Sequence, residues 1–221
     1  RTTARRTAGR TVSTPHGPSR ANDGSLLYVG TCTPESHEGG QTAVRIYRST
    51  DGLEWELLGE IPPTQEAIEK KYLYCEPHGI QLPDGKMIVH IRAQTNSEVY
   101  SEHIFSIFQS VSTDGGHTWT EPVRLIDHGS PPHLLRHSSG VLICAYGYRL
   151  PPYGQRVMFS YDNGESWDVD YILRDDGPSG DLGYPCSVEL KDGRILTVYY
   201  QQTGEGKPCS ILSSMWELPK R

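Results

Sequence analysis

The chain has 221 residues, 35% of them hydrophobic, and a formal net charge of -6. This size and composition indicate a soluble globular protein with a substantial core, and they exclude a membrane span, because no apolar run approaches the roughly 20 residues that a bilayer needs. The acidic balance gives no general attraction to nucleic acid, so any anion must be bound by a local group of arginines.

The first ten residues, RTTARRTAGR, hold four arginines and have neither an initiator methionine nor an apolar stretch. They therefore match neither a signal peptide nor a natural start. We expect residues 1–11 to be a poorly ordered remnant of a preceding region in a longer protein.

Four β-hairpins of one design follow along the chain. The clearest is GYPCSVELKDGRILTVYYQ at 183–201, where two extended runs flank a turn at Asp192 and Gly193. The same plan begins at His16, Glu76 and Pro131. Repetition of one unit along a chain indicates a repeat architecture.

In chain order, we expect the first unit to have strands at 12–22, 25–30, 43–49 and a fourth ending at Ile61. The segment PPTQEAIEKKY at 62–72 has helical composition. Strands of the second unit are expected near 76–82, 86–93, 104–112 and 119–126, and those of the third near 133–137, 141–147, 155–161 and 167–173. The fourth unit has its hairpin and one further strand at 209–216.

Each unit is thus a four-stranded antiparallel meander of about 50 to 60 residues, the size of a propeller blade. The fourth unit lacks an outer strand of its own. The sequence therefore predicts an all-β fold, a single β-propeller domain over residues 1–221 with about four blades.

A second motif, S-x-D-x-G-x-x-W, connects the third and fourth strands. It occurs at 112–119 and 160–167, and residues 49–55 give a version one residue shorter. Serine and aspartate accept hydrogen bonds from nearby backbone groups, glycine tolerates positive φ, and tryptophan brings apolar surface to the next strand. We therefore predict a structural role, not a catalytic one, for Asp51, Asp114 and Asp162.

Strand direction alternates, so both kinds of turn are expected at one end of the propeller. The starts of first strands and the ends of second strands then meet at the other end, around the axis. Aligned on their turns, the hairpins place four residues at one equivalent position: Thr14, Glu76, Pro131 and Tyr184. Close to two residues further on lie His16, His78, His133 and Cys186.

These motifs resemble the sialidase (neuraminidase) superfamily, whose repeat is the Asp-box, over about 15–219. The resemblance implies a six-bladed propeller of which this chain holds the C-terminal blades. It also implies an exo-acting, retaining glycoside hydrolase that removes sialic acid or a related 2-keto-3-deoxy sugar acid. The family's first arginine and its acid/base aspartate come from earlier blades and have no match here.

Tyr184 matches the tyrosine nucleophile of that family, although Pro185 replaces the usual small residue and Gln201 the usual glutamate. Glu76 matches the glutamate that takes the phenol proton, and Arg92 matches an arginine that binds the substrate carboxylate. A further arginine belongs after the second strand of the next blade. Arg149 or Arg156 could fill that role.

These residue types suit a sialoside, whose anomeric carbon bears a carboxylate. Arginines bind such a group through bidentate, charge-assisted hydrogen bonds. A carboxylate nucleophile would be repelled by it, whereas a phenol is not, and sialidases are a known exception to the two-carboxylate scheme. A phenol needs a base to take its proton. We expect the nearby arginines to lower its pKa.

Structural alternatives remain for these residues. Tyr184 could pack on the next blade, and Glu76 could be a carboxylate paired with Lys71 or Arg92. The histidines that follow proline are expected to fill a repeated hydrogen-bonding position in preference to binding metal. His78 could touch the substrate, and Tyr200 could form a wall of the pocket.

The five cysteines are scattered, with no CxxC pair: Cys32, Cys75, Cys144, Cys186 and Cys209. This odd count favours buried thiols over a disulfide framework or a zinc site. We expect no metal, no cofactor and no nucleic-acid partner, a glycan as substrate, a monomer, and a secreted or periplasmic location for the full-length parent. The alternatives are a non-catalytic propeller that binds acidic glycans and an inactive fragment of the enzyme.

Overall fold

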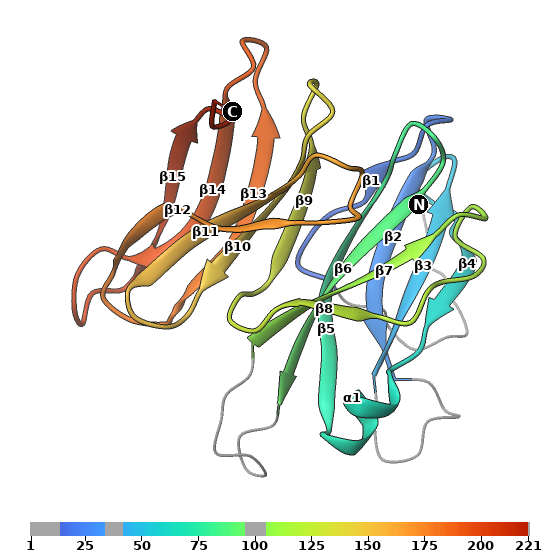
Figure 1. The fold of residues 1–221 in the computed structure, drawn as a ribbon, viewed down its shortest axis with the longest axis horizontal. Coiled ribbons are helices and arrows are strands. Elements are labelled where there is room, and N and C mark those ends of the chain that lie inside the picture. Colours follow the sequence, from blue (N-terminus) through green and yellow to red (C-terminus); the bar gives the residue numbers. More distant parts are fainter. Residues whose placement is uncertain (1–13, 34–41, 96–104, 221) are drawn as a thin grey trace, which may run out of the picture.

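The hairpin repeats fold into four antiparallel β-sheets, which form the blades of a β-propeller (Figure 1). The structure is a computed structural model, and it describes residues 14–33, 42–95 and 105–220. Each sheet follows chain order from the axis outward. The prediction of an all-β propeller with about four blades is confirmed.

The first blade comprises β1 (Ser19–Arg20), β2 (Leu26–Cys32), β3 (Ala43–Ser49) and β4 (Glu56–Ile61). The second comprises β5 (Tyr72–Gln81), β6 (Met87–Thr95), β7 (Phe105–Ser112) and β8 (Val123–Ile126). The third comprises β9 (Pro132–Arg136), β10 (Leu142–Tyr148), β11 (Tyr153–Ser160) and β12 (Asp168–Gly177). Within the described residues, the fourth has three strands, β13 (Leu182–Glu189), β14 (Ile195–Gln202) and β15 (Cys209–Trp216).

The largest differences from the predicted strand bounds are in β1, β5, β8 and β12, and β8 begins four residues after the expected start at 119. β1 is only two residues long, because Pro15 and Pro18 lack the N–H groups that a sheet ladder needs. Residues 12–13 of that predicted strand, and the predicted remnant 1–11, lie outside the described residues. β5 begins four residues before Glu76, and β12 continues four residues beyond the expected end at 173.

The helical composition before the second blade produces one short helix, α1 (Gln65–Glu69). Its N-cap is Thr64, whose hydroxyl accepts a hydrogen bond from the backbone N–H of Ala67 at 3.0 Å. This helix leads into β5, the strand that carries Glu76 (Figure 1). Nowhere in the described part of the chain is a helix long and apolar enough to cross a membrane.

Apolar layers between consecutive blades form the core. Side chains alternate between the two faces of each strand, so Leu142, Cys144 and Tyr146 of β10 pack toward the second blade. Ile143 and Ala145 pack in the other direction, toward the fourth. This alternation fixes which residues of each strand are buried.

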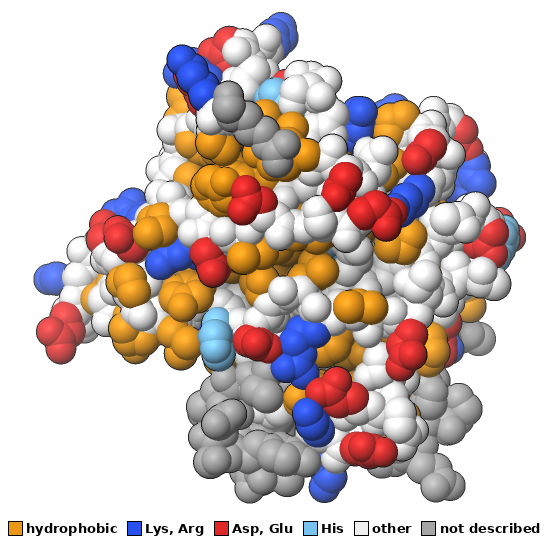
Figure 2. All heavy atoms as spheres, in the orientation of Figure 1, with side chains coloured by type: hydrophobic (Ala, Val, Ile, Leu, Met, Phe, Trp, Pro, Cys, Tyr) orange, Lys and Arg blue, Asp and Glu red, His pale blue; other side chains and the backbone are white. Residues whose placement is uncertain are grey.

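The face of the fourth blade that points away from the third is exposed in the described chain. Its apolar side chains are Val188, Val198, Ile211 and Met215. Figure 2 shows hydrophobic side chains at the surface in the region of β14 and β15.

The S-x-D turns have the structural role that their residues predict. The Asp162 carboxylate accepts hydrogen bonds from the N–H and the hydroxyl of Ser166, and Ser160 Oγ accepts from Gly164 N at 2.8 Å. These bonds, with the Ser166 hydroxyl first, lower the pKa of Asp162 to about 2. The turns at Asp51 and Asp114 repeat the arrangement.

All five cysteines are free thiols. Cys32 and Cys144 are buried and Cys75 is partly buried, but Cys186 and Cys209 are exposed. The expectation of buried thiols is therefore wrong for these two, because both lie on the fourth blade, whose outer face is open.

Candidate active site

Glu76 and Tyr184 occupy equivalent positions of β5 and β13, and both have a strained backbone. Their φ angles are +47° and +52°, in the left-handed region that non-glycine residues rarely adopt. Each lies at a β-bulge, where pairing with the neighbouring strand is interrupted, and each precedes a proline. Strain of this kind costs energy and gathers at functional sites, so the paired outliers point to this end of the propeller.

These two residues meet although 108 positions separate them. The Tyr184 hydroxyl donates a hydrogen bond to Glu76 Oε1, and Arg92 Nη1 forms an ion pair with Glu76 Oε2. The other nitrogen of that guanidinium, Nη2, donates to Gln94 Oε1 at 2.6 Å. A phenol, a carboxylate and a guanidinium therefore lie in one connected group, with Glu76 between the other two.

The phenol of Tyr184 is protonated at neutral pH. Burial, and then the hydrogen bond to Glu76, raise its pKa to about 12, and the positive charge of Arg92 opposes them only in part. Arg92 lowers this pKa, as the sequence predicts, but burial and the hydrogen bond to Glu76 outweigh its effect. The phenol needs a base for its proton, and Glu76 already accepts that hydrogen bond.

Arg149 and Arg92 both lie over one aromatic ring, that of Phe105. The Cζ atoms of Arg92 and Arg149 lie 5.3 Å and 5.7 Å from the centre of the Phe105 ring. Arg149 Nη1 also donates to the carbonyl of Gly180 at 2.8 Å. No motif in the sequence singles out Phe105, the first residue of β7.

Arg156 is placed elsewhere. Its guanidinium is buried, donates to the carbonyls of Arg174 and Pro152 at 2.8 Å and 3.3 Å, and lies over the ring of Tyr148. These contacts hold the outer strands of the third blade together. Of the two candidate arginines, the geometry favours Arg149 for contact with a ligand.

Tyr200 lies beside the nucleophile candidate. Its ring centre is 5.8 Å from that of Tyr184, with 35° between the ring planes. Its hydroxyl donates to Asp181 Oδ1 at 2.9 Å. Tyr200 therefore lies next to Tyr184, and that it forms a wall of a pocket stays a prediction. Asp181, which directly precedes β13, was not a predicted site residue.

His78 is buried on the axis and does not reach the surface of the site. Its ring stacks on His133 with 4.5 Å between centres, and His16 lies 5.1 Å from it. Its Nδ1 accepts a hydrogen bond from Leu134 N at 2.9 Å. Among the described residues, no group of three histidine, cysteine or acidic side chains is arranged to hold a metal ion.

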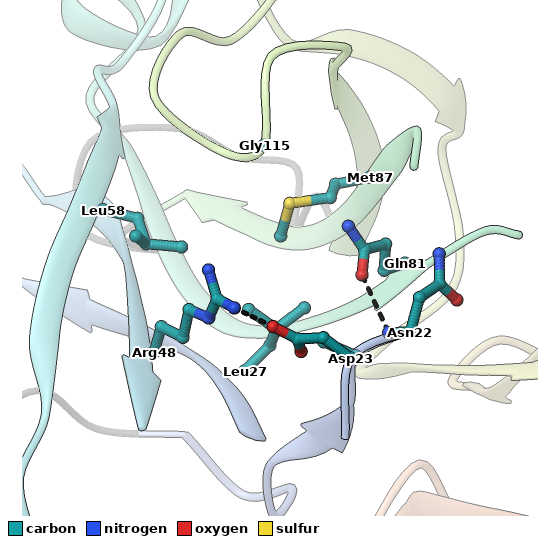
Figure 3. A pocket seen from close by; sticks show the side chains of 9 residues that line it. Asn22, Asp23, Leu27, Arg48, Leu58, Gln81, Met87 and Gly115 are labelled. Atoms are coloured by element: carbon teal, nitrogen blue, oxygen red, sulfur yellow. Dashed lines mark hydrogen bonds and ion pairs between the residues drawn. The ribbon is translucent and has the colours of Figure 1, made fainter. Parts of the chain in front are cut away.

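A cavity of about 200 Å³ lies at the turn end of the first two blades, away from these residues (Figure 3). Its lining includes an ion pair between Arg48 and Asp23, and Asn22 N donates to Gln81 Oε1 at 3.0 Å. Gln81 is five residues along β5 from Glu76, roughly 17 Å in an extended strand. Because its charged groups neutralise each other, this cavity is a weaker candidate than the group at Tyr184.

Several solved structures have folds similar to this chain. A protein of unknown function from Dyadobacter fermentans matches with a TM-score of 0.78 and 26% identity, over 94% of this chain and 54% of that one. The Hadza microbial sialidase Hz136 matches with a TM-score of 0.64 and 17% identity, over 91% and 45%. The GH93 α-L-arabinofuranosidase of Fusarium graminearum, in complex with arabinobiose, matches with a TM-score of 0.67 and 20% identity, over 91% and 62%.

The chain thus spans between 45% and 62% of the length of these proteins. No curated protein sequence matches it. Residues 11–197, most of the chain, match the model of the BNR repeat-like domain, and the protein belongs to this family of the sialidase-like superfamily.

Proposed function

We propose that this chain carries the nucleophile, its base and two carboxylate-binding arginines of a retaining exo-glycoside hydrolase. The substrate would be a glycan that ends in sialic acid or a related 2-keto-3-deoxy sugar acid. The observation that carries the proposal is the hydrogen bond from Tyr184 to Glu76, made between two strained residues of different blades.

In the first step, the Tyr184 oxygen forms a bond to the anomeric carbon while Glu76 takes the phenol proton. The glycosidic C–O bond breaks, and the leaving alcohol receives a proton from a general acid. In the second step, the deprotonated form of that acid takes a proton from water as the water oxygen bonds to the anomeric carbon, the bond to Tyr184 breaks, and Glu76 returns its proton to the phenolate. Two displacements at one carbon retain its configuration.

The arginines explain why the sugar would be an acid. Arg92 and Arg149 both lie over the ring of Phe105. Arg92 is joined to Tyr184 through Glu76, and Arg149 lies against Gly183, the residue before Tyr184, so two positive charges lie near the phenol. A carboxylate on the anomeric carbon would receive charge-assisted hydrogen bonds from them. A neutral phenol can approach that carbon without the repulsion that a carboxylate nucleophile would meet.

The test is the hydrolysis of a fluorogenic sialoside by the full-length protein. Tyr184→Phe keeps the ring but removes the nucleophilic oxygen, so we expect kcat/KM to fall by about 10³ or more. Tyr171→Phe is the matched control, because Tyr171 also donates to a carboxylate, that of Asp168 at 2.6 Å, on the outer strand of the third blade. Activity of Tyr184→Phe within a few-fold of the parent would refute the nucleophile assignment.

The second candidate is a propeller that binds acidic glycans without cleaving them. The raised pKa of Tyr184 favours it, because a phenol that holds its proton so firmly is a poor nucleophile. Binding of a sialoside to the full-length protein without release of its fluorophore would support this function over the first.

A further inference from the structure

Asp181 places a carboxylate near the site, beside Tyr200, and the proposed reaction does not use it. The residue is exposed and directly precedes β13. Its Oδ1 accepts the hydroxyl of Tyr200 at 2.9 Å, and its Oδ2 accepts the thiol of Cys209 at 3.3 Å. Two partners on different strands therefore hold this carboxylate in one orientation although it faces solvent.

The segment around Asp181 lies against the guanidinium group of Arg149 at two places. The carbonyl of Gly180 accepts from Arg149 Nη1 at 2.8 Å. On the other side, Gly183 lies so close that an added Cβ would be 3.3 Å from Arg149 Nη2. In the sequence, Asp181 thus lies between Gly180 and Gly183, which both lie against Arg149, the proposed carboxylate-binding residue. Tyr184 directly follows Gly183.

The hydrogen bond to Tyr200 is not needed to satisfy a buried hydroxyl. Tyr200 is partly exposed, so water could serve its hydroxyl equally well. The ring of Tyr200 is 5.8 Å from that of Tyr184, which places the pair of Tyr200 and Asp181 along the wall of the site. The position of this pair suits contact with a ligand better than support of the fold.

An ionised carboxylate accepts hydrogen bonds but donates none, and it offers about four lone-pair directions. Tyr200 and Cys209 use two of them. The remaining directions suit a sugar hydroxyl or an ammonium group, whereas a phosphate or sulfate would be repelled.

We propose that Asp181 is a specificity residue that selects sugar acids with a single negative charge. It would accept hydrogen bonds from hydroxyl groups of the sugar while Arg92 and Arg149 hold the carboxylate, and it would exclude sugar acids that carry a second anionic group near the fourth blade. This inference rests on the proposed function of the two arginines.

The experiment measures binding to the full chain by calorimetry, with two probes. One is N-acetylneuraminic acid, which carries one negative charge. The other is its 9-phosphate, which adds between one and two charges. We expect the parent chain to prefer the first probe, and Asp181→Asn to reduce that preference by about tenfold, the size of one like-charge repulsion across a few ångströms of partly wet protein.

Asp168→Asn is the matched control, because it also changes an exposed aspartate that accepts a tyrosine hydroxyl. It should leave the preference unchanged. Asp181→Ser is measured beside Asp181→Asn, so that a folding defect of one variant does not decide the result, and both unfolding temperatures are recorded.

The outcomes separate the two proposals. A parent that binds the monoanion, with a preference unchanged within twofold in both Asp181 variants, overturns the role of Asp181 and leaves the arginine site standing. Failure of the parent to bind either probe overturns the carboxylate site and the role of Asp181 together. A preference that falls in both Asp181 variants but not in Asp168→Asn supports the inference.

Discussion

Arg92 and Tyr200 stand at the same position of two blades, each seven residues after the glycine of its hairpin turn. Each lies beside the strained residue of its own blade: Arg92 pairs with Glu76, and Tyr200 lies against the ring of Tyr184. Equivalent strand positions in two blades therefore carry an ion pair, Arg92 with Glu76, in one blade and a pair of aromatic rings, Tyr200 and Tyr184, in the other. The hydrogen bond between Tyr184 and Glu76 joins these pairs.

The first prediction concerns the base. Glu76→Gln keeps the shape of the side chain but cannot take a proton, so we expect kcat of the full-length protein to fall by about 10²-fold or more. Glu60→Gln is the control, because Glu60 also pairs with an arginine, Arg45 at 2.7 Å, in the first blade. Equal activity of the two variants would show that Glu76 only balances the charge of Arg92.

The second prediction separates the two arginines of the third blade. Arg149→Lys loses the planar fork that binds carboxylates, so KM for a sialoside should rise about tenfold or more. Arg156→Lys should leave KM nearly unchanged but lower the free energy of unfolding by about 1 to 3 kcal/mol, because the buried guanidinium loses its hydrogen bonds to the carbonyls of Arg174 and Pro152. Steady-state kinetics and urea unfolding give the two readouts, and a reversed pattern would transfer the ligand role to Arg156.

The third prediction is a loss of stability in acid. Burial lowers the pKa of His16 to about 4 and that of His133 to about 3. Burial, and then the neighbouring histidines, lower the pKa of His78 well below its usual value. In the unfolded chain these histidines bind protons with a pKa near 6.5, whereas in the folded chain they bind them only at a lower pH. Stability is therefore full above about pH 6.5 and decreases as the pH falls below it.

Between pH 6.5 and pH 5, each such histidine should cost roughly 2 kcal/mol of unfolding free energy. Urea unfolding at several pH values measures this loss, and His78→Asn should make the pH dependence shallower. A free energy of unfolding that is the same at pH 7.5 and pH 5 would contradict the burial of neutral rings on the axis.

The fourth prediction concerns the S-x-D turns. Asp162→Ala removes the acceptor for the N–H and the hydroxyl of Ser166, so Tm should fall by a few degrees. The turn lies at the end of the propeller opposite Tyr184, so kcat/KM measured below the new Tm should stay within about twofold. A large loss of activity without a loss of stability would place this aspartate in the reaction.

The sequence was sufficient to predict the repeat architecture, because the alternation of side chains and the Asp-Gly turns are local signals. It also predicted that Glu76, Arg92 and Tyr184 gather at one end, since equivalent strand positions must meet around an axis. It could not choose between Arg149 and Arg156. That choice depends on which carbonyls and rings each guanidinium reaches after folding, and these lie in other strands.

Two further features depend on packing that no pattern records. The sign of the pKa shift of Tyr184 is set by burial against the opposing effect of Arg92. Phe105 and Asp181 are candidate site residues because of contacts with residues that are distant in the sequence, so no local pattern identifies either of them. The short β1 is different, because its two prolines are visible in the sequence and argue against a long strand.

The most direct measurement is mass spectrometry of the full-length protein after reaction with an activated sialoside whose glycosyl-enzyme intermediate hydrolyses slowly. The account predicts that one sialyl group is attached to the peptide that contains Tyr184, and that Tyr184→Phe gains none. A sialyl group on another residue, or complete turnover by Tyr184→Phe, would contradict it.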